Sequence, residues 1–238
     1  MPSNKIIGPV PVRPRPVIAI DGPAGAGKST VARRLADRLG FLLVDTGALY
    51  RAVAFASERQ GVAWQDAPNV EQVAEQIAPT LVLTRAADGS VRVALDGDDI
   101  SEAIRTPRMA TGASMVSAYV GVRLALLGIQ RQAALQGGVV LEGRDIGTSV
   151  FPDAEVKFFL TAQDEVRARR RHEELLAKGT RVTLEETLAD VRARDQRDRD
   201  RPVAPLRQAS DAVLVDSSNR SIDAVVEEMA ALVANVTR

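Results

Sequence analysis

The sequence predicts an α/β protein built on a five-stranded parallel sheet with helices on both faces. Short apolar runs rich in β-branched residues alternate along the chain with longer segments of helical periodicity. Parallel strands need helical crossovers, and runs without polar alternation indicate strands buried on both faces. A glycine-rich turn at 22–29 follows the first run and leads directly into the first helix. The expected architecture therefore has three layers.

Each core element is assigned from its own pattern. The expected strands lie at 17–20, 41–44, 139–141, 156–160 and 212–215. The expected helices lie at 30–39, 46–58, 107–117, 120–136, 163–178, 184–199 and 221–233. Gly137 and Gly138 end one helix, since glycine readily adopts the left-handed conformation that closes a helix. Thr183 and Glu186 have the spacing of a capping box, so a separate helix begins after Thr183.

The stretch 62–104 does not follow the strand–helix alternation. A helix at 70–77 precedes two short strands at 81–84 and 91–95, which an Asp88-Gly89 turn joins. Two strands joined by an Asp-Gly turn indicate an antiparallel hairpin. We therefore expect a small inserted α+β subdomain at 62–104.

The remaining domain boundaries follow from composition. Residues 1–16 contain five prolines and are expected to form a disordered arm. The core is expected to comprise 17–61, 105–162 and 186–238. The heavily charged helical region 163–185 is set apart from this core.

Composition excludes several classes of protein. Lysine plus arginine and aspartate plus glutamate each total 31 in 238 residues, so no net field favours nucleic acid or a membrane surface. Cysteine is absent, which excludes disulfides, thiolate chemistry and cysteine metal sites. No apolar run reaches the length of a membrane span. We expect a cytoplasmic protein, acting as a monomer without a nucleic-acid or membrane partner.

The turn at 22–29 is a complete phosphate-binding loop, G-x-x-x-x-G-K-[ST], and both flanking elements are of the required type. A chance glycine-rich turn is the alternative that these flanks disfavour. Lys28 is expected at the β- and γ-phosphates of a nucleotide, and the Ser29 hydroxyl at Mg²⁺. The candidate ATP-binding residues are Gly22, Pro23, Ala24, Gly25, Ala26, Gly27, Lys28, Ser29 and Thr30.

Three further polar clusters are candidate ligands of a second substrate. The segment 45–51 follows the second strand and offers Thr46 and Arg51, which could instead be a helix cap and a solvated side chain. The segment 142–145 follows the third strand and offers Arg144 and Asp145, which could instead form a strand-end ion pair. The run 192–201 alternates in charge as solvated helix faces do, but it also supplies arginines for phosphoryl transfer.

With these motifs in this order, the chain resembles the bacterial cytidylate kinases from about residue 17 to its end. The resemblance rests on 20–23, 45–51, 142–148, 150–154, Arg194-Asp195 with Asp198 and Arg201, and 204–206. It implies a P-loop kinase core and the reaction of ATP with CMP or dCMP, with Mg²⁺, to give ADP and CDP or dCDP. It also implies that the insert lies on the nucleoside-monophosphate side and that the segment from about Arg167 is a mobile lid.

The resemblance also implies roles for individual residues. Ser114, Arg123 and Asp145 correspond to residues that hold the cytosine ring, and Asp198 to one that holds the ribose. Arg51, Arg144, Arg194 and Arg201 correspond to phosphate ligands, and Thr46 lies near the acceptor nucleotide. Lys28 with Arg144, Arg194 and Arg201 would form the catalytic set. Mg²⁺ would rest on Ser29, partly through water, with Asp21 or Glu142 as further candidates.

Two departures and two alternatives accompany this interpretation. Val120 and Gly121 stand where the family often has proline and arginine, and the Asp-Glu pair of many P-loop hydrolases is absent. A carboxylate at position 145 suits the exocyclic amine of cytosine and opposes the carbonyl of uracil. Another kinase of small molecules, such as a UMP/CMP or shikimate-type enzyme, remains open, as does a nucleotide sensor without transfer activity.

Overall fold

The computed structural model describes residues 13–86, 91–177 and 179–236. Its core is a parallel sheet of five strands in the order β2-β6-β1-β7-β8, which confirms the predicted fold class. The strands are β1 (Val17–Asp21), β2 (Leu42–Asp45), β6 (Val139–Glu142), β7 (Val156–Thr161) and β8 (Val213–Asp216). β1 is the central strand, and its neighbours β6 and β7 were both predicted as buried runs. The carboxyl ends of β1, β2 and β6 therefore meet at one edge of the sheet.

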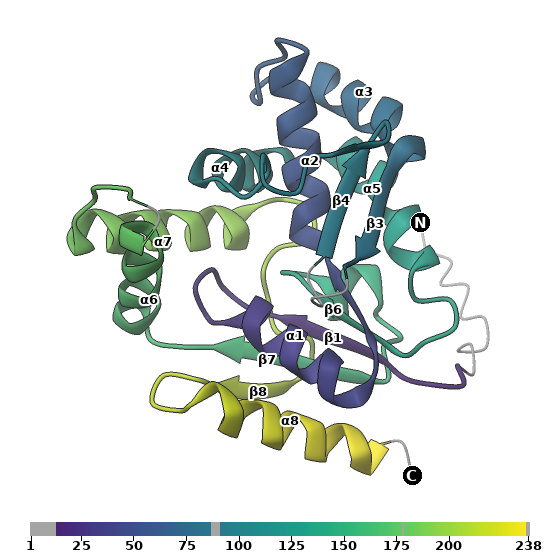
Figure 1. Cartoon of the computed structure of the whole chain (residues 1–238), viewed down its shortest axis with the longest axis vertical. Helices are drawn as coiled ribbons and strands as arrows, with labels where there is room; N and C mark the ends of the chain where they lie inside the picture. The colour runs from purple at the N-terminus through teal and green to yellow at the C-terminus, as the bar shows by residue number, and fades with distance from the viewer. Residues whose placement is uncertain (1–12, 87–90, 178, 237–238) are drawn as a thin grey trace, which may run out of the picture.

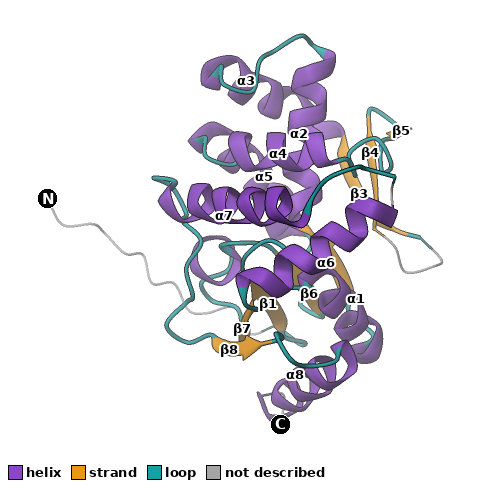
Figure 2. Ribbon diagram, turned by 90° about the vertical axis from the view of Figure 1, so that its left-hand side faces the viewer, coloured by secondary structure: helices purple, strands orange, loops and turns teal. Residues whose placement is uncertain are grey.

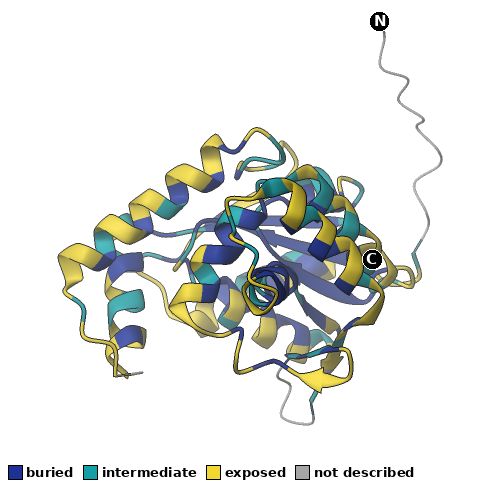
Figure 3. Cartoon of the chain, turned by 90° about the horizontal axis from the view of Figure 1, so that it is seen from above, coloured by how far each residue is buried: buried dark blue, intermediate teal, exposed yellow. Residues whose placement is uncertain are grey.

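The two faces of the sheet are covered unequally (Figure 1). Helices α1 (Lys28–Leu39) and α8 (Ile222–Val236) pack on one face, where alternate strand residues such as Ile18 and Phe158 contact them. The other face is covered by the end of α5 (Val120–Gln132) and by the segment 146–154. Most of the core sheet is buried in Figure 3, as strands between two layers must be, whereas the edge strand β8 has only Val215 buried.

The insert shares one apolar core with the helices around it. Its elements are α3 (Ala67–Ile77), a 3₁₀ turn at Ala78–Thr80, β3 (Leu81–Arg85), β4 (Val91–Leu95) and β5 (Asp98–Asp99). β3 and β4 pair antiparallel as predicted, whereas the two-residue β5 was not predicted. The expected Asp88-Gly89 turn lies outside the described residues. Side chains of α2 (Thr46–Arg59), α4 (Pro107–Val116) and α5 complete the cluster of buried residues around the insert.

Helices α6 (Asp164–Ala177) and α7 (Leu184–Asp200) project together from the core (Figures 1 and 2). α7 begins with the predicted capping box, because the Thr183 side chain accepts from the Glu186 N–H and the Glu186 side chain accepts from the Thr183 N–H. Much of the surface of both helices is exposed (Figure 3), but their inner residues contact Ala24 in the loop that follows β1.

The part of the N-terminal arm that the structure describes, Arg13 to Pro16, contacts the core. The Arg13 guanidinium pairs with Asp153 at 2.5 Å and Glu155 at 2.9 Å, and the Arg15 guanidinium lies 4.3 Å from the centre of the Phe41 ring. The expectation of a disordered arm at 1–16 thus meets packed residues at its last four positions. The other twelve positions lie outside the described residues.

Within the described ranges, no single helix has the length and apolar character needed to cross a membrane. The consecutive helices α4 and α5 meet that test only when they are taken together, across a bend of 105°.

Candidate active site

The phosphate-binding loop joins β1 to α1 and lies over the end of the sheet. Gly22 has φ +149°, and a Cβ there would lie 2.0 Å from the Leu160 carbonyl oxygen, so only glycine fits this position. Lys28 and Ser29 occupy the first turn of α1, where unpaired backbone N–H groups and the helix dipole favour an anion. The Lys28 ammonium is buried and donates to the Pro23 carbonyl at 2.7 Å. The loop therefore presents backbone N–H groups and a buried ammonium group at the N-terminus of α1.

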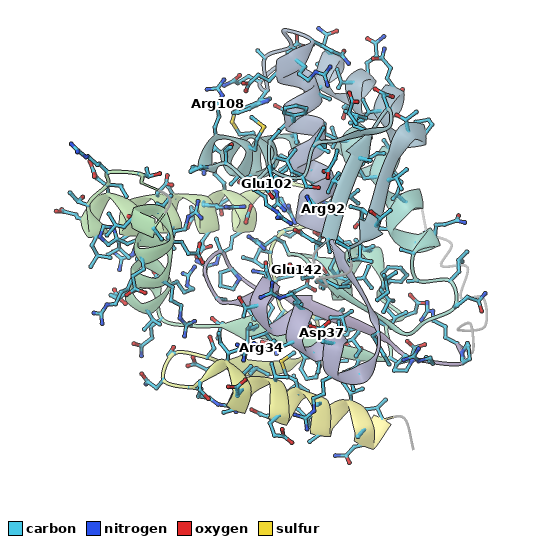
Figure 4. The ribbon with its side chains drawn as sticks, viewed as in Figure 1. Arg34, Asp37, Arg92, Glu102, Arg108 and Glu142 are labelled. Carbon is cyan, nitrogen blue, oxygen red and sulfur yellow. The ribbon has the colours of Figure 1, made fainter. Side chains whose placement is uncertain are left out.

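The carboxylate of Glu142, at the end of β6, faces the Ser29 hydroxyl. Ser29 Oγ donates to Glu142 Oε2 at 2.9 Å, and Thr46 Oγ1 donates to the Glu142 backbone carbonyl at 2.7 Å. Figure 4 shows Glu142 between the core sheet and the helices above it. Burial, followed by repulsion from Asp45, raises the pKa of Glu142 to about 7. A cation beside Glu142 would stabilise its ionised form and so offset the rise in its pKa.

Asp21, the other carboxylate considered for the metal, is engaged elsewhere. Its two oxygens accept from the backbone N–H groups of Ile146 and Gly147, each at 2.8 Å. These two residues open a π-helical turn at Ile146–Val150, directly after Asp145. Asp21 thus joins the end of the central strand to the turn that carries Asp145.

Many cations line one cleft of about 1030 Å³, among them Lys28, Arg51, Arg144 and Arg194. Burial, followed by repulsion from Arg144 and Arg194, lowers the pKa of Lys28 well below its ordinary value. Burial, followed by repulsion from Arg144, lowers the pKa of Arg194 to about 10. Among the described residues, the buried Nε atoms of Arg51 and Arg194 have no hydrogen-bond partner. Concentrated positive charge with unused donors is the environment that a polyanion such as a phosphate chain fits.

A buried carboxylate, Asp145, lines the cleft beyond these cations. Its side chain is 6% exposed and lies between two guanidinium groups. Arg123 donates to Oδ2, and Arg201 donates to Oδ1 at 2.9 Å. Arg201 also donates to Ser117 Oγ at 3.3 Å and to the Ala204 carbonyl at 2.6 Å. Asp145 is therefore held in a fixed position as a hydrogen-bond acceptor.

Asp198, on α7, connects two other segments that line the cleft. It accepts from Arg144 Nε at 3.0 Å and from Ser114 Oγ at 3.3 Å. Burial alone would raise the pKa of Asp198, but the nearby arginines 144, 194 and 201 outweigh it and hold that pKa below its usual value. Asp198 is thus an ionised acceptor at neutral pH.

Comparison with known proteins agrees with this geometry. The sequence profile described as "Cytidylate kinase" matches residues 18–235. The chain belongs to the cytidylate kinase family. It is 52% identical over 218 residues to a cytidylate kinase of Syntrophotalea carbinolica, covering 92% of each chain. It is 49% identical over 217 residues to that of Geobacter sulfurreducens, covering 91% of this chain and 92% of the relative.

Among solved structures, an uncharacterized protein from Eubacterium ventriosum has a similar fold. The TM-score is 0.54 at 11% identity, and the match covers 92% of this chain and 99% of that protein. At this identity the likeness concerns the fold alone.

Most of the residues predicted for the site of this family member line one cleft, whereas Gly22 and Pro23 of the phosphate-binding loop and Arg123 do not line it. The cleft is lined by Ala24, Gly25, Ala26, Gly27, Lys28, Ser29, Thr30, Thr46, Arg51, Ser114, Arg144, Asp145, Arg194, Asp198 and Arg201. Arg123 lies behind Asp145 and reaches it through its guanidinium group. Arg201, predicted as a phosphate ligand, lines the cleft and donates to Asp145.

Sequence reasoning assigned no role to several residues that shape the cleft, although Asp45 and Asp195 stand in motifs that it singled out. Asp45 caps α2 by accepting from the Ala48 N–H at 3.1 Å and also pairs with Arg51 at 2.7 Å. Its position directly after a strand was the available signal. Arg167 and Asp195 form a buried ion pair beside the phosphate-binding loop, and no periodicity marked them within the charged run.

Gly121, at one of the two positions where the chain departs from the family pattern, contacts a side chain of α3. The Gly121 N–H, at the start of α5, donates to Glu71 Oε1 at 2.7 Å. A Cβ at Gly121 would lie 2.7 Å from the Glu71 carboxyl carbon. Glu71 of α3 therefore fills the space where a side chain at position 121 would stand, and it caps the N-terminus of α5.

Proposed function

We propose that this protein is an enzyme that transfers the γ-phosphoryl group of ATP to CMP and dCMP, giving ADP and CDP or dCDP. The observation that carries the proposal is the position of Asp145. It is a buried carboxylate fixed between two guanidinium groups, in a cleft that the phosphate-binding loop and several cations also line. One cleft thus offers groups suited to a phosphate donor, to phosphate charge and to a base.

The donor side is the loop at 22–30, whose backbone N–H groups and Lys28 would hold the phosphates of ATP. The attacking group is a phosphate oxygen of the acceptor, which is already anionic, so the reaction needs no general base. Catalysis would consist of positioning the two nucleotides and neutralising the charge that spreads over the transferred group. Lys28, Arg144 and Arg194 would serve this neutralisation because they converge on one region of the cleft.

The acceptor side would recognise cytosine by hydrogen bonding. Asp145 would accept from the exocyclic amine, while Arg123 and Ser114 would donate to the ring nitrogen and carbonyl. Asp198 would hold the ribose, and Arg51, Arg144 and Arg194, with Thr46 beside them, would hold the phosphate of the acceptor. The contact of Arg201 with Asp145 supports a role in fixing the base acceptor, alongside its expected role at the phosphates.

The residues around Ser29 fit a magnesium ion. Mg²⁺ prefers oxygen ligands, keeps several waters and is commonly held by one or two carboxylates together with substrate phosphates. Ser29 Oγ and Glu142 Oε2 lie 2.9 Å apart, and Asp45 is close enough to raise the pKa of Glu142. Within the described residues, no group of three or more His, Cys, Asp or Glu forms a protein-only metal cage. When bound, the ion would neutralise phosphate charge.

We also propose that the insert at 62–104 acts on the CMP side and that the region 163–185 acts as the lid over ATP. α6 and α7, which contain this region, project beside the cleft and supply several of its arginines. We expect a monomer in the cytoplasm, and size-exclusion chromatography with light scattering would test the oligomeric state.

The deciding experiment measures ADP release from Mg·ATP with CMP, dCMP, UMP, AMP, GMP or shikimate as acceptor. Turnover confined mainly to CMP and dCMP is expected. Turnover with a different acceptor would overturn the cytosine assignment but not the kinase activity. ATP binding without any acceptor-dependent turnover would instead identify a nucleotide sensor.

A further inference from the structure

An arginine of α6, Arg167, is among the largest side chains that the fold buries completely, with 1% of its side chain exposed. Its guanidinium group is engaged on every side. It donates to the Ala162 carbonyl at 3.0 Å and to the Ala24 carbonyl at 2.7 Å, and it pairs with Asp164 at 2.6 Å. Its last contact is with Asp195 of α7, also at 2.6 Å. One side chain thus connects α6, α7 and the phosphate-binding loop.

Asp195 completes this connection from the other helix. Its Oδ2 forms an ion pair with the Arg167 guanidinium group without hydrogen-bond geometry, and its Oδ1 accepts from the Ala24 N–H at 3.2 Å. Both backbone polar groups of Ala24 are therefore held by the pair, the carbonyl by Arg167 and the N–H by Asp195. The neighbouring Gly25 packs so closely on α6 that a Cβ there would lie 3.1 Å from Arg167 Cβ.

The pair also fixes the residue next to it. Arg194 precedes Asp195 on α7 and lines the cleft, where the structure leaves its buried Nε without a partner. Because neighbouring helical residues point in different directions, anchoring Asp195 under the loop sets the rotation of α7 that aims Arg194 into the cleft. A displacement of α7 by even an ångström would misplace a group whose work depends on position.

We propose that Arg167 and Asp195 are positioning residues for the ATP site: together they hold the phosphate-binding loop in its nucleotide-ready shape and keep Arg194 in register with it. This inference rests on the proposed function, since it assigns the loop to ATP. The inference also distinguishes a buried ion pair from exposed ion pairs between α6 and α7. The buried pair serves the nucleotide, whereas the exposed pairs of Arg192, with Glu165 at 2.9 Å and with Asp164 at 3.2 Å, are solvated and contribute little.

The test compares Asp195→Asn with Arg192→Ala, the matched control on the same helix. ATP and ADP binding is measured by titration calorimetry without acceptor, and CMP binding is measured separately. The Ala24 N–H would lose a charged acceptor and Arg167 its ion-pair partner, so we expect ATP and ADP to bind about tenfold more weakly or worse. CMP, of whose proposed ligands only Arg194 depends on the pair, should weaken less than ATP and ADP, and Arg192→Ala should alter neither ligand.

A merely structural role for the pair is tested with two further variants. Arg167→Lys keeps the charge but lacks the planar fork that reaches two carbonyls and two carboxylates together, so it should also weaken ATP binding. The double variant Arg167→Met with Asp195→Leu replaces the ion pair by apolar contacts, which commonly preserve stability. We expect it to unfold near the wild-type temperature while binding ATP weakly.

The outcomes separate this inference from the proposed function. Wild-type ATP affinity in a folded Asp195→Asn, or in the apolar double variant, would refute the positioning role, as would equal losses for CMP and ATP. Because binding is measured without acceptor, absence of CMP-dependent turnover in the wild-type protein would overturn only the proposed reaction.

Discussion

Replacing Asp145 with asparagine should weaken the preference for CMP over UMP. The wild-type carboxylate offers only acceptors to the base, so it accepts from the amine of cytosine and opposes the carbonyl of uracil. The asparagine side chain has an oxygen and an NH₂ group, and the NH₂ group can donate to uracil. It therefore reduces the advantage of cytosine and the penalty on uracil at once.

The magnitude follows from the contacts of this carboxylate. A hydrogen bond to a charged group contributes about 1.5–3 kcal/mol, which corresponds to about 10- to 150-fold in kcat/KM for CMP. Arg123 and Arg201 both donate to Asp145, so an amide there leaves one guanidinium facing another donor. The cost of placing these two donors against each other applies equally to CMP and UMP. The ratio of the two kcat/KM values therefore isolates base recognition, and we expect it to fall by about tenfold or more.

The assay is coupled ADP release under first-order conditions with CMP and UMP in parallel. Ser117→Ala is the control, because it removes an acceptor of Arg201 without changing the group that meets the base. This control should lower both rates in similar proportion and leave the ratio unchanged. An unchanged ratio in Asp145→Asn would refute the assignment of Asp145 as the base acceptor.

Three further predictions follow from the same site. Arg194→Ala should lower kcat more than it raises the KM for ATP, because the unpartnered Nε of Arg194 is available to charge that develops during transfer. Steady-state kinetics measure both constants. A change in KM alone would identify Arg194 as a ligand of the ground state. Glu142→Gln should raise the Mg²⁺ concentration for half-maximal activity by about tenfold or more, and an unchanged Mg²⁺ titration would remove Glu142 from the metal site. Asp21 should make stability depend on pH, since burial raises its pKa from 3.8 to about 6. Its proton is bound in the folded state and released in the unfolded state between these values, so its contribution to stability is full below pH 3.8 and declines as pH rises through about 6. The free energy of unfolding of the wild type relative to Asp21→Asn should thus fall by up to about 3 kcal/mol between pH 4 and 7, measured by urea denaturation; a constant difference would contradict the raised pKa.

Much of the core could be predicted because its signals are local. The loop at 22–29 is defined by residues that are contiguous in sequence, and the capping box at Thr183 spans only four residues. Each core strand is a short apolar run, so its existence did not depend on knowing its neighbours. The carboxyl ends of parallel strands gather at one edge, which is why Ser29, Thr46 and Glu142 could be expected near one another.

The rest depended on contacts between distant segments. Asp195 and Asp198 are buried in a run whose alternating charges are typical of a solvated helix face, and only the packing of α7 against the cleft selects them. Asp21 was identified in a motif, but its bonds to Ile146 and Gly147 join residues 125 and 126 positions away. The π-helical turn that follows Asp145 has no periodic signature at all. Local patterns locate elements, whereas burial of a charge is decided by the whole fold.

The crowding of cations in the cleft has a practical consequence for handling the protein. Lys28, Arg144 and Arg194 repel one another in the free protein. Any small dianion that enters the cleft therefore reduces this electrostatic repulsion. Phosphate and sulfate in a purification or storage buffer should therefore raise the melting temperature and compete with both nucleotides. Nucleotide affinities measured in phosphate buffer would therefore be too low. A buffer of bulky monoanions would give the affinities without this competition.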